Sequence, residues 1–295
     1  MFGTNTITGK SFFKDAPKDS LYVTSMFFTL QGEGPYAGMP ALFIRLTKCN
    51  LTCNFCDTFF DDGEWMTYNE IFAKAYHTIC DYWNNKGQPV PLWALPVSVM
   101  SDKQYNFPNI VLVITGGEPL LQENIGPFLD RASKIFGKTQ IESNGIPDTV
   151  VPECTMLVCS PKCAEKEGKP TKYLKPSKTI LERADCLKFV MSADPESPYH
   201  TIPDWAIEWS ETKGDVYCSP MNIYNTFPQK IKLLRAEKGE ITMAERSTVD
   251  EIISFWEPGL LDLAANQANH EYTAKYCLDH GFRLNLQQHL YVSMA

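Results

Sequence analysis

Residues 41–58 read A-L-F-I-R-L-T-K-C-N-L-T-C-N-F-C-D-T and place three cysteines, Cys49, Cys53 and Cys56, directly after an apolar run. The run at 41–46 predicts a buried strand, so the cysteine loop follows that strand's carboxyl end. Thiolates are soft ligands that suit iron–sulfur clusters and zinc. A closed structural site supplies four ligands, whereas a catalytic metal keeps one position open, and this loop offers three. Half of a zinc site and ordinary buried thiols remain alternatives on spacing alone.

A second motif has the same position relative to a strand. Residues 110–114 (I-V-L-V-I) form a continuous apolar run, as expected of a buried parallel strand, and T-G-G-E-P follows at 115–119. Glycines let the backbone approach a ligand closely, and Glu118 supplies a carboxylate that can hold an ammonium group. Because active sites of α/β barrels form at the carboxyl ends of the strands, we expect both motifs on one face.

The rest of the chain alternates between strand and helix patterns. Further strand patterns occupy 21–30, 139–143, 156–160, 185–191, 215–219 and 282–286, and helix patterns occupy 67–83, 262–280 and a segment that ends at 136. This alternation predicts βαβ units and a parallel sheet. Since about six such units follow the cysteine loop, fewer than a closed barrel needs, we expect a partial (β/α)6 barrel. Residues 1–295 are expected to form one domain with irregular insertions near 87–109, 163–183 and 223–258.

The overall composition is that of an ordinary globular protein. The chain has 295 residues, of which 44% are hydrophobic and 21% charged, and its formal net charge is −8. An acidic chain is a poor candidate for nucleic-acid binding. No apolar stretch approaches the ~18 residues of a membrane span, and residues 1–18 lack the apolar core of a signal peptide. Ten cysteines are too sparse for a secreted disulfide scaffold, so we expect a reducing, cytoplasmic setting without a nucleic-acid or membrane partner.

Two more strand patterns end in polar residues. Glu142 and Asn144, in E-S-N-G, offer hydrogen bonds to ribose hydroxyls, although Asn-Gly is also a plain turn. Ser160 and Lys162, in S-P-K, offer a hydroxyl and an ammonium for a carboxylate or ribose, with a solvated surface lysine as the alternative. Both pairs are expected on the face that carries the cysteine loop.

A second group of cysteines surrounds the S-P-K element. It consists of Cys154, Cys159 and Cys163. A second cluster there would lack an evident fourth ligand, so ordinary buried thiols are the better interpretation.

The motifs together resemble one family. The run T-L-Q-G-E-G-P-Y-A-G-M-P at 29–40, which leads into the cysteine loop, and the T-G-G-E-P, E-x-N-G, S-P-K and C-terminal L-Q-x-H elements resemble the 7-carboxy-7-deazaguanine synthases of the radical S-adenosylmethionine (SAM) superfamily. The resemblance covers the core and both ends but not the three insertions. It implies a [4Fe–4S] cluster on the three cysteines of the loop, with an iron left open to chelate SAM, and a 5′-deoxyadenosyl radical that abstracts a hydrogen atom.

The resemblance also implies a reaction. In this family 6-carboxy-5,6,7,8-tetrahydropterin is converted to 7-carboxy-7-deazaguanine with release of ammonia, in the pathway to queuosine and other 7-deazaguanines. Mg²⁺ assists, an external donor such as flavodoxin supplies the electron, and the enzymes commonly form homodimers.

Site residues follow from the same resemblance and from their chemistry. SAM is expected to contact Phe55, which also shields the cluster, and residues at three strand ends: Gly116, Gly117, Glu118, Glu142, Asn144, Ser160 and Lys162. The substrate is expected to contact Gln31, Glu33, Arg45, Thr115, His289 and Ala295. Glu33 suits the guanidine-like edge of a pterin, Arg45 suits its carboxylate, and the Thr58 hydroxyl suits Mg²⁺, which prefers oxygen ligands. A surface histidine on a frayed tail is the alternative for His289.

Two other functions remain compatible with the sequence. A radical SAM enzyme with another substrate, such as a glycyl-radical activase, would keep the cluster but would not need Glu33 and Arg45. A regulatory protein would use its insertions to bind a partner, above all at 88–108 and 224–256.

Overall fold

The computed structural model describes residues 6–53, 55–56, 58–99, 104–223 and 263–291. Its strands are β1 (Ser20–Leu30), β2 (Pro40–Leu46), β3 (Glu64–Thr67), β4 (Val97–Val99), β5 (Gln104–Gly116), β6 (Phe136–Ser143), β7 (Met156–Cys159), β8 (Cys163–Lys166), β9 (Lys169–Tyr173), β10 (Cys186–Met191), β11 (Asp215–Pro220) and β12 (Arg283–Leu284). Its helices are α1 (Tyr68–Asn84), α2 (Ile125–Ala132), α3 (Lys178–Arg183), α4 (Asp204–Thr212), α7 (Leu263–His280) and α8 (Gln288–Tyr291).

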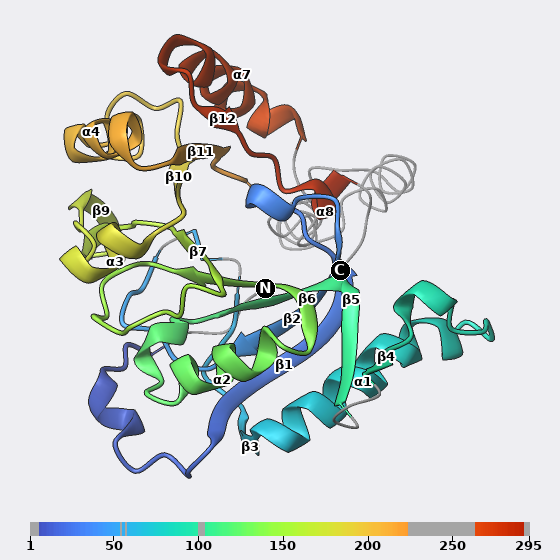
Figure 1. Cartoon of the computed structure of the whole chain (residues 1–295). Coiled ribbons are helices and arrows are strands. Elements are labelled where there is room, and N and C mark those ends of the chain that lie inside the picture. The colour runs from blue at the N-terminus through green and yellow to red at the C-terminus, as the bar shows by residue number, and fades with distance from the viewer. Residues whose placement is uncertain (1–5, 54, 57, 100–103, 224–262, 292–295) are drawn as a thin grey trace, which may run out of the picture.

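One large, mostly parallel sheet organises the molecule. Its strand order is β12-β11-β10-β7-β6-β5-β2-β1-β3, and β4 pairs with β5 beside this path. Neighbouring strands from β2 to β12 are parallel, whereas β1 pairs antiparallel with both β2 and β3. Figure 1 shows this succession as its colours run from blue at β1 to red at β12. The prediction of an α/β fold with a parallel sheet is therefore confirmed.

Helices make most of the crossovers that parallel pairing requires. Helix α1 precedes β5, α2 precedes β6, α3 precedes β10, α4 precedes β11 and α7 precedes β12. The connection from β6 to β7, which the structure describes throughout, contains no helix. From β2 onward, each parallel strand joins the sheet beside the preceding parallel strand. Because these strands run in the same direction, their carboxyl ends lie along one edge of the sheet.

Successive side chains along each strand point to opposite faces of the sheet. In β2, Leu42, Ile44 and Leu46 belong to the main hydrophobic core, and Arg45 lies between two of them in the sequence. In β5 the alternate residues Val111 and Val113 form a second, smaller core cluster with Ala41. This explains the continuous apolar run at 110–114, because that strand is buried on both faces.

Helix α1 begins at the predicted position because its first turn is capped. The Thr67 hydroxyl accepts the Glu70 N–H over 3.3 Å, and the Glu70 carboxylate accepts the Thr67 N–H over 2.7 Å. This reciprocal pair is a capping box, which satisfies two backbone donors at the helix start. The apolar residues Ile71, Ala75 and Ile79 then bury one face of the helix.

The prediction of an irregular insertion at 163–183 is wrong. This segment contains the hairpin β8–β9 and helix α3, which completes the crossover between β7 and β10. Glu167 and Gly168 form the hairpin turn with φ of 54° and 73°, as a two-residue type I′ turn requires. The hairpin escaped detection because its strands are largely exposed and carry no apolar run.

Two boundaries around β5 also differ from the prediction. Strand β5 starts at Gln104, inside the segment expected to be irregular, and continues through Pro108, beside which its register with β6 shifts. The helix expected to reach 136 ends at Ala132, and Phe136 instead opens β6. Its ring stacks on Phe107 at 5.4 Å, so a contact between distant residues overrides the helical pattern.

Several short elements carried too little pattern to be predicted. They are β3, β4, α4 and α8, and the final strand shrinks to Arg283–Leu284. Strand β4 lies inside the segment 87–109 expected to be irregular, where it pairs antiparallel with β5. The expected insertion at 223–258 lies outside the described residues, apart from residue 223. Among the described helices, none combines the length and apolar character needed to cross a membrane.

Candidate active site

A cavity of ≈ 260 Å³ opens at the carboxyl ends of the parallel strands. Residues in or just after successive strands line it: Arg45, Thr115, Glu142, Ser160, Lys188, Ser219 and Gln287. The cysteine loop forms a further part of the wall through Cys49, Cys53 and Cys56. The expectation that the motifs share one face is therefore correct.

The cysteine loop and the T-G-G-E-P turn are in direct contact. The Glu118 N–H donates to the Lys48 carbonyl over 2.8 Å. A Cβ added to Gly117 would lie 1.9 Å from that same carbonyl oxygen, so only glycine fits there. Lys48 itself has φ of 69°, a left-handed conformation that turns the chain immediately before Cys49.

The N-terminal segment holds the other side of the cysteine loop. The Thr8 N–H donates to the Cys49 carbonyl over 2.7 Å, and Ile7 forms an isolated parallel bridge with Cys49. The Leu51 N–H donates to Cys49 Sγ over 3.4 Å. The first cysteine is thus fixed by backbone contacts on two sides before any ligand binds.

Glu118 is a buried carboxyl at the base of the cavity, with 1% of its surface exposed. Its Oε1 accepts from the Leu120 N–H at 2.9 Å and the Ser143 hydroxyl at 2.8 Å, and its Oε2 accepts from the Asn144 N–H at 2.7 Å. Burial raises the pKa of Glu118 to about 7 and outweighs these donors, which lower it. One acceptor position on Oε2 remains for an ammonium group.

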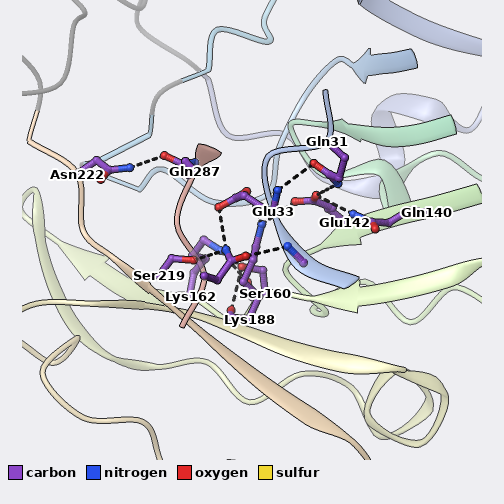
Figure 2. Close-up of polar contacts among 12 residues, drawn as sticks. Gln31, Glu33, Gln140, Glu142, Ser160, Lys162, Lys188, Ser219, Asn222 and Gln287 are labelled. Carbon is purple, nitrogen blue, oxygen red and sulfur yellow. Dashed lines mark hydrogen bonds and ion pairs between the residues drawn. The ribbon is translucent and has the colours of Figure 1, made fainter. Parts of the chain in front are cut away.

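Lys188 joins two carboxylates inside the cavity (Figure 2). Its Nζ lies 2.8 Å from Glu33 Oε2 and 2.7 Å from Glu142 Oε2. Burial alone lowers the pKa of Lys188, but the attraction of the two carboxylates outweighs burial and raises it. For Glu142 the signs are reversed: burial raises its pKa, but the attraction of Lys188 outweighs burial and lowers it. Lys188 and Glu142 therefore carry opposite charges near neutral pH.

Amides complete the surroundings of these carboxylates. Gln140 Nε2 and Gln31 Nε2 donate to Glu142 Oε1 over 3.0 Å and 3.4 Å. Asn285, just after β12, donates from Nδ2 to Glu33 Oε1 over 3.4 Å and accepts the Gly34 N–H over 2.8 Å. The turn at Glu33 is thus held by residues that lie far away in the sequence.

Arg45, near the carboxyl end of β2, forms a hydrogen bond with Thr58. Arg45 Nη1 donates to Thr58 Oγ1 over 2.6 Å. The guanidinium also lies 5.2 Å from the centre of the Phe27 ring, within the range of a cation–π contact. Arg45 is therefore positioned before a ligand carboxylate arrives.

The S-P-K element presents its polar groups to the same cavity. Lys162 Nζ donates to the Ser160 hydroxyl over 2.6 Å and to the Ser160 carbonyl over 2.8 Å (Figure 2). Burial lowers the pKa of Lys162. The alternative of a solvated surface lysine is wrong, because Lys162 lines the cavity.

Most residues expected at the site line this one cavity. They are Gln31, Glu33, Arg45, Cys49, Cys53, Phe55, Cys56, Thr58, Thr115, Gly117, Glu118, Glu142, Asn144, Ser160 and Lys162. Gly116 stands outside this group and has φ of 131°, and a Cβ there would lie 2.2 Å from the Leu46 carbonyl oxygen. His289 falls in α8 with its side chain outside the described part of the chain, and Ala295 also lies outside it.

Sequence reasoning missed several residues of the cavity. The most informative is Lys188; the other polar ones are Ser143, Ser219, Asn222 and Gln287, and the apolar ones are Phe43, Leu51, Phe60, Val190 and Pro220. Asn222 donates to Gln287 at the far end of the cavity (Figure 2). Lys188 had a detectable signal, since a lysine interrupts the apolar strand C-L-K-F-V-M at an inward-facing position. Asn222 and Gln287 lie in loops with no comparable pattern.

The cysteines of the second group do not lie together at one end of a strand. Cys154 is exposed and precedes β7, whereas Cys159 ends β7 and is fully buried. The two therefore lie at opposite ends of one strand. Within the described ranges, no three Cys, His, Asp or Glu side chains are gathered to hold a metal ion.

The cysteine loop suits a cluster better than a single ion. In a cubane each thiolate binds its own iron, so Cys49, Cys53 and Cys56 need to share a wall and need not converge on one point. Burial raises the pKa of Cys49 to about 12 and that of Cys53 to about 11. A cationic group must therefore displace the thiol protons to bind there. Three cysteines on one wall of the cavity therefore fit a cluster held by three thiolates.

The fold and this cavity define an α/β enzyme of the type that binds its ligands at the carboxyl ends of parallel strands. A 7-carboxy-7-deazaguanine synthase from Rhodospirillum rubrum is 33% identical over 206 residues, which cover 69% of this chain and 71% of that protein. The chain therefore belongs to the family of 7-carboxy-7-deazaguanine synthases.

Two further comparisons agree. The 7-carboxy-7-deazaguanine synthase of Rickettsia prowazekii is 29% identical over 294 residues, covering 100% of this chain and 96% of that one. The crystal structure of QueE from Escherichia coli has the same fold, with a TM-score of 0.50 at 19% identity over 96% of this chain and 99% of that one. A scan against protein-family models found no match.

Proposed function

We propose that this chain is an enzyme that contracts the ring of 6-carboxy-5,6,7,8-tetrahydropterin to 7-carboxy-7-deazaguanine and releases ammonia, in 7-deazaguanine biosynthesis of the queuosine type. One observation carries the proposal beyond family membership. A single cavity contains the cysteine loop together with a carboxylate and a guanidinium, Glu33 and Arg45, that complement the two ends of a carboxylated pterin. A glycyl-radical activase would not need this pair, and no contact among the described residues favours a regulatory role.

The cofactors in this proposal are a [4Fe–4S] cluster on Cys49, Cys53 and Cys56, and SAM. When bound, they supply a 5′-deoxyadenosyl radical that takes a hydrogen atom from the substrate. Glu118 supplies a carboxylate for the SAM ammonium, and Gly117 lets the backbone approach it. Glu142, Asn144, Ser160 and Lys162 offer partners for the ribose and carboxylate, and Phe55 packs edge-on against Tyr199 at 5.1 Å beside the loop.

The chain's own residues hold the substrate in this scheme. Glu33 accepts from the guanidine-like edge, and Arg45 binds the carboxylate bidentately, because a planar guanidinium matches a carboxylate. Gln31 and Thr115 line the same cavity and add hydrogen-bonding groups. Together they fix the ring carbon that bears the carboxylate. His289 and Ala295 stay proposed substrate contacts from the resemblance alone.

Mg²⁺ fits the present arrangement poorly. Thr58 is the proposed oxygen ligand, but the Arg45 guanidinium already donates to its hydroxyl over 2.6 Å. A divalent cation at that oxygen would be repelled by the guanidinium. We therefore assign magnesium no step.

Several broader features belong to the same proposal. The consecutive strand order supports a partial (β/α)6 barrel. None of the cysteines is in a disulfide, which supports a reducing, cytoplasmic setting. A homodimer and an external electron donor such as flavodoxin are proposed from the family resemblance.

The test is anaerobic turnover by protein reconstituted with iron and sulfide. With SAM, reductant and carboxytetrahydropterin, we expect 7-carboxy-7-deazaguanine, detected by mass, and ammonia in equal amount. Cys53→Ser should lose the cluster absorbance and all product. Cys154→Ser is the matched control, because this thiol is exposed and lies away from the cavity, and it should keep both. Protein that cleaves SAM with an intact cluster but forms no deazaguanine would contradict the proposal.

A further inference from the structure

Lys188 is an unusual component of a central strand. It lies on β10, only 7% exposed, and its side chain reaches the cavity rather than the helix-covered core. The residues beside it, Leu187 and Phe189, are fully buried in that core. A lysine is almost never buried without a partner, so this position is defined by what the ammonium binds.

The ammonium holds two carboxylates that would otherwise oppose each other. Glu33 Oε2 and Glu142 Oε2 both lie within 2.8 Å of Lys188 Nζ. Their side chains are each 15% exposed, so solvent screens them only weakly. Without the lysine, two like charges would share one site, and one carboxyl would take up a proton or turn away.

Among the described residues, the Lys188 ammonium makes the shorter of two long-range hydrogen bonds to the Glu33 carboxylate. Glu33 lies in the turn between β1 and β2, whereas Lys188 lies on β10 and Asn285 follows β12. The bond from Lys188 to Glu33 is 2.8 Å, and the bond from Asn285 to Glu33 is 3.4 Å. The lysine therefore anchors a carboxylate on a turn to the rigid centre of the sheet.

The remaining hydrogen-bonding capacity of the two carboxylates differs. An ionised carboxylate offers about four acceptor positions, two on each oxygen. Glu33 uses one on Oε2 for Lys188 and one on Oε1 for Asn285, so each oxygen keeps one. Glu142 uses both on Oε1 for Gln31 and Gln140 and one on Oε2 for Lys188, so a single position remains.

We propose that Lys188 is a positioning residue that holds Glu33 as a two-oxygen acceptor for the guanidine-like edge of the pterin and restricts Glu142 to a single hydrogen bond. This inference rests on the proposed function and deepens it. The ammonium and the two carboxylates sum to one negative charge, which favours a donor-rich edge over an anionic group. Substrate selection at this end of the cavity then depends on a residue that need not touch the substrate.

The test compares the pterin with an analogue that lacks its 2-amino group. For wild type, carboxytetrahydropterin should bind at least about tenfold more tightly than the 2-deamino analogue, because the analogue leaves a charged acceptor unpaired. Kd values are measured for both compounds on reconstituted protein with SAM present. Lys188→Met should lower this discrimination ratio to the value of Glu33→Gln, and Lys188→Arg should keep most of it.

Arg183 provides the matched control. This cation is also largely buried and pairs with Asp185 over 2.9 Å, but it lies outside the cavity and binds the carbonyls of Val151 and Pro152. Arg183→Met should destabilise the fold and leave the discrimination ratio unchanged. Should Lys188→Met fail to fold, the double variant Lys188→Met/Glu142→Gln removes one charge of each sign and should still lose the ratio.

The outcomes separate the two proposals. A wild type that converts the pterin, combined with an unchanged ratio in Lys188→Met or the double variant, overturns the role of Lys188 alone. A wild type that neither binds nor converts the pterin overturns both proposals. If the discrimination ratio falls equally in Arg183→Met and Lys188→Met, the Lys188 ion pair acts only on stability, and the inference is overturned.

Discussion

Several titratable residues of the cavity have shifted pKa values because of burial and of the charges beside them. Glu118 is buried and Glu142 is mostly buried, yet the pKa of Glu118 is raised to about 7 and that of Glu142 is lowered. The difference is an ion pair, since Lys188 lies against Glu142, whereas the hydrogen bonds to Glu118 come from neutral donors. The charge of Lys162 also lowers the pKa of Glu118, but burial outweighs it. A buried carboxyl without a cation favours its protonated form. Glu118 is therefore suited to gain its cation from a ligand.

This assignment predicts a pH dependence of SAM binding. A SAM ammonium pairs best with ionised Glu118, and below its pKa of about 7 the carboxyl must first lose a proton. The affinity for SAM should therefore rise with pH, by up to about tenfold per unit below 7, and level off above it. Equilibrium titrations of reconstituted protein at a series of pH values measure this slope. Glu118→Gln should bind SAM more weakly and without the slope, and a flat wild-type profile would refute the role of Glu118.

At the scale of elements, the site depends on how separate segments hold the cysteine loop. The T-G-G-E-P turn contacts it at Lys48, and the N-terminal segment contacts it at Cys49. Both contacts use backbone groups, so their geometry depends on chain path more than on side-chain identity. The loop is therefore ordered by its neighbours as well as by any metal.

Thr8 allows a direct test of the N-terminal contact. Thr8→Pro removes the N–H that donates to the Cys49 carbonyl, whereas Thr8→Ala keeps it. A net hydrogen bond contributes about 1 kcal/mol, so the proline variant should lose its cluster about fivefold faster under chelator. Absorbance decay after addition of a chelator measures the rate. Equal rates in the two variants would show that the N-terminal segment does not stabilise the loop.

At the scale of the whole molecule, one sheet connects the edge strand β3 with β12. The main core extends along it from Leu21 to Cys277 and includes residues of every parallel strand from β2 to β11. We propose that the chain is a single domain, because the parallel strands contribute to one hydrophobic core and cannot unfold independently of one another.

The proposal predicts one cooperative unfolding transition. Leu112 is fully buried in β5 at the centre of the sheet, whereas Leu92 is 87% exposed. Leu112→Ala should lower the free energy of unfolding by about 2–5 kcal/mol, and Leu92→Ala should change it by less than about 0.5 kcal/mol. Denaturant titrations followed by circular dichroism and by tryptophan fluorescence should give coincident curves. Separate midpoints for the two probes would argue for more than one unit.

The features that could be predicted before the structure was known are those that depend on local pattern. Apolar runs and helical spacing located the main parallel strands and helix α1, and polar motifs at strand ends located most of the cavity wall. These predictions succeeded because the carboxyl ends of parallel strands must meet at one edge. The hairpin β8–β9 was missed because its strands are largely exposed and lack an apolar face.

The pairing of polar groups inside the cavity could not be predicted, because it depends on how distant strands pack. Lys188 contacts Glu33 across 155 positions of the chain and Glu142 across 46. A lysine in an apolar strand indicates that a partner exists, but no local pattern indicates which carboxylate it will reach. That choice depends on strand order, register and twist, which arise from the packing of the whole sheet.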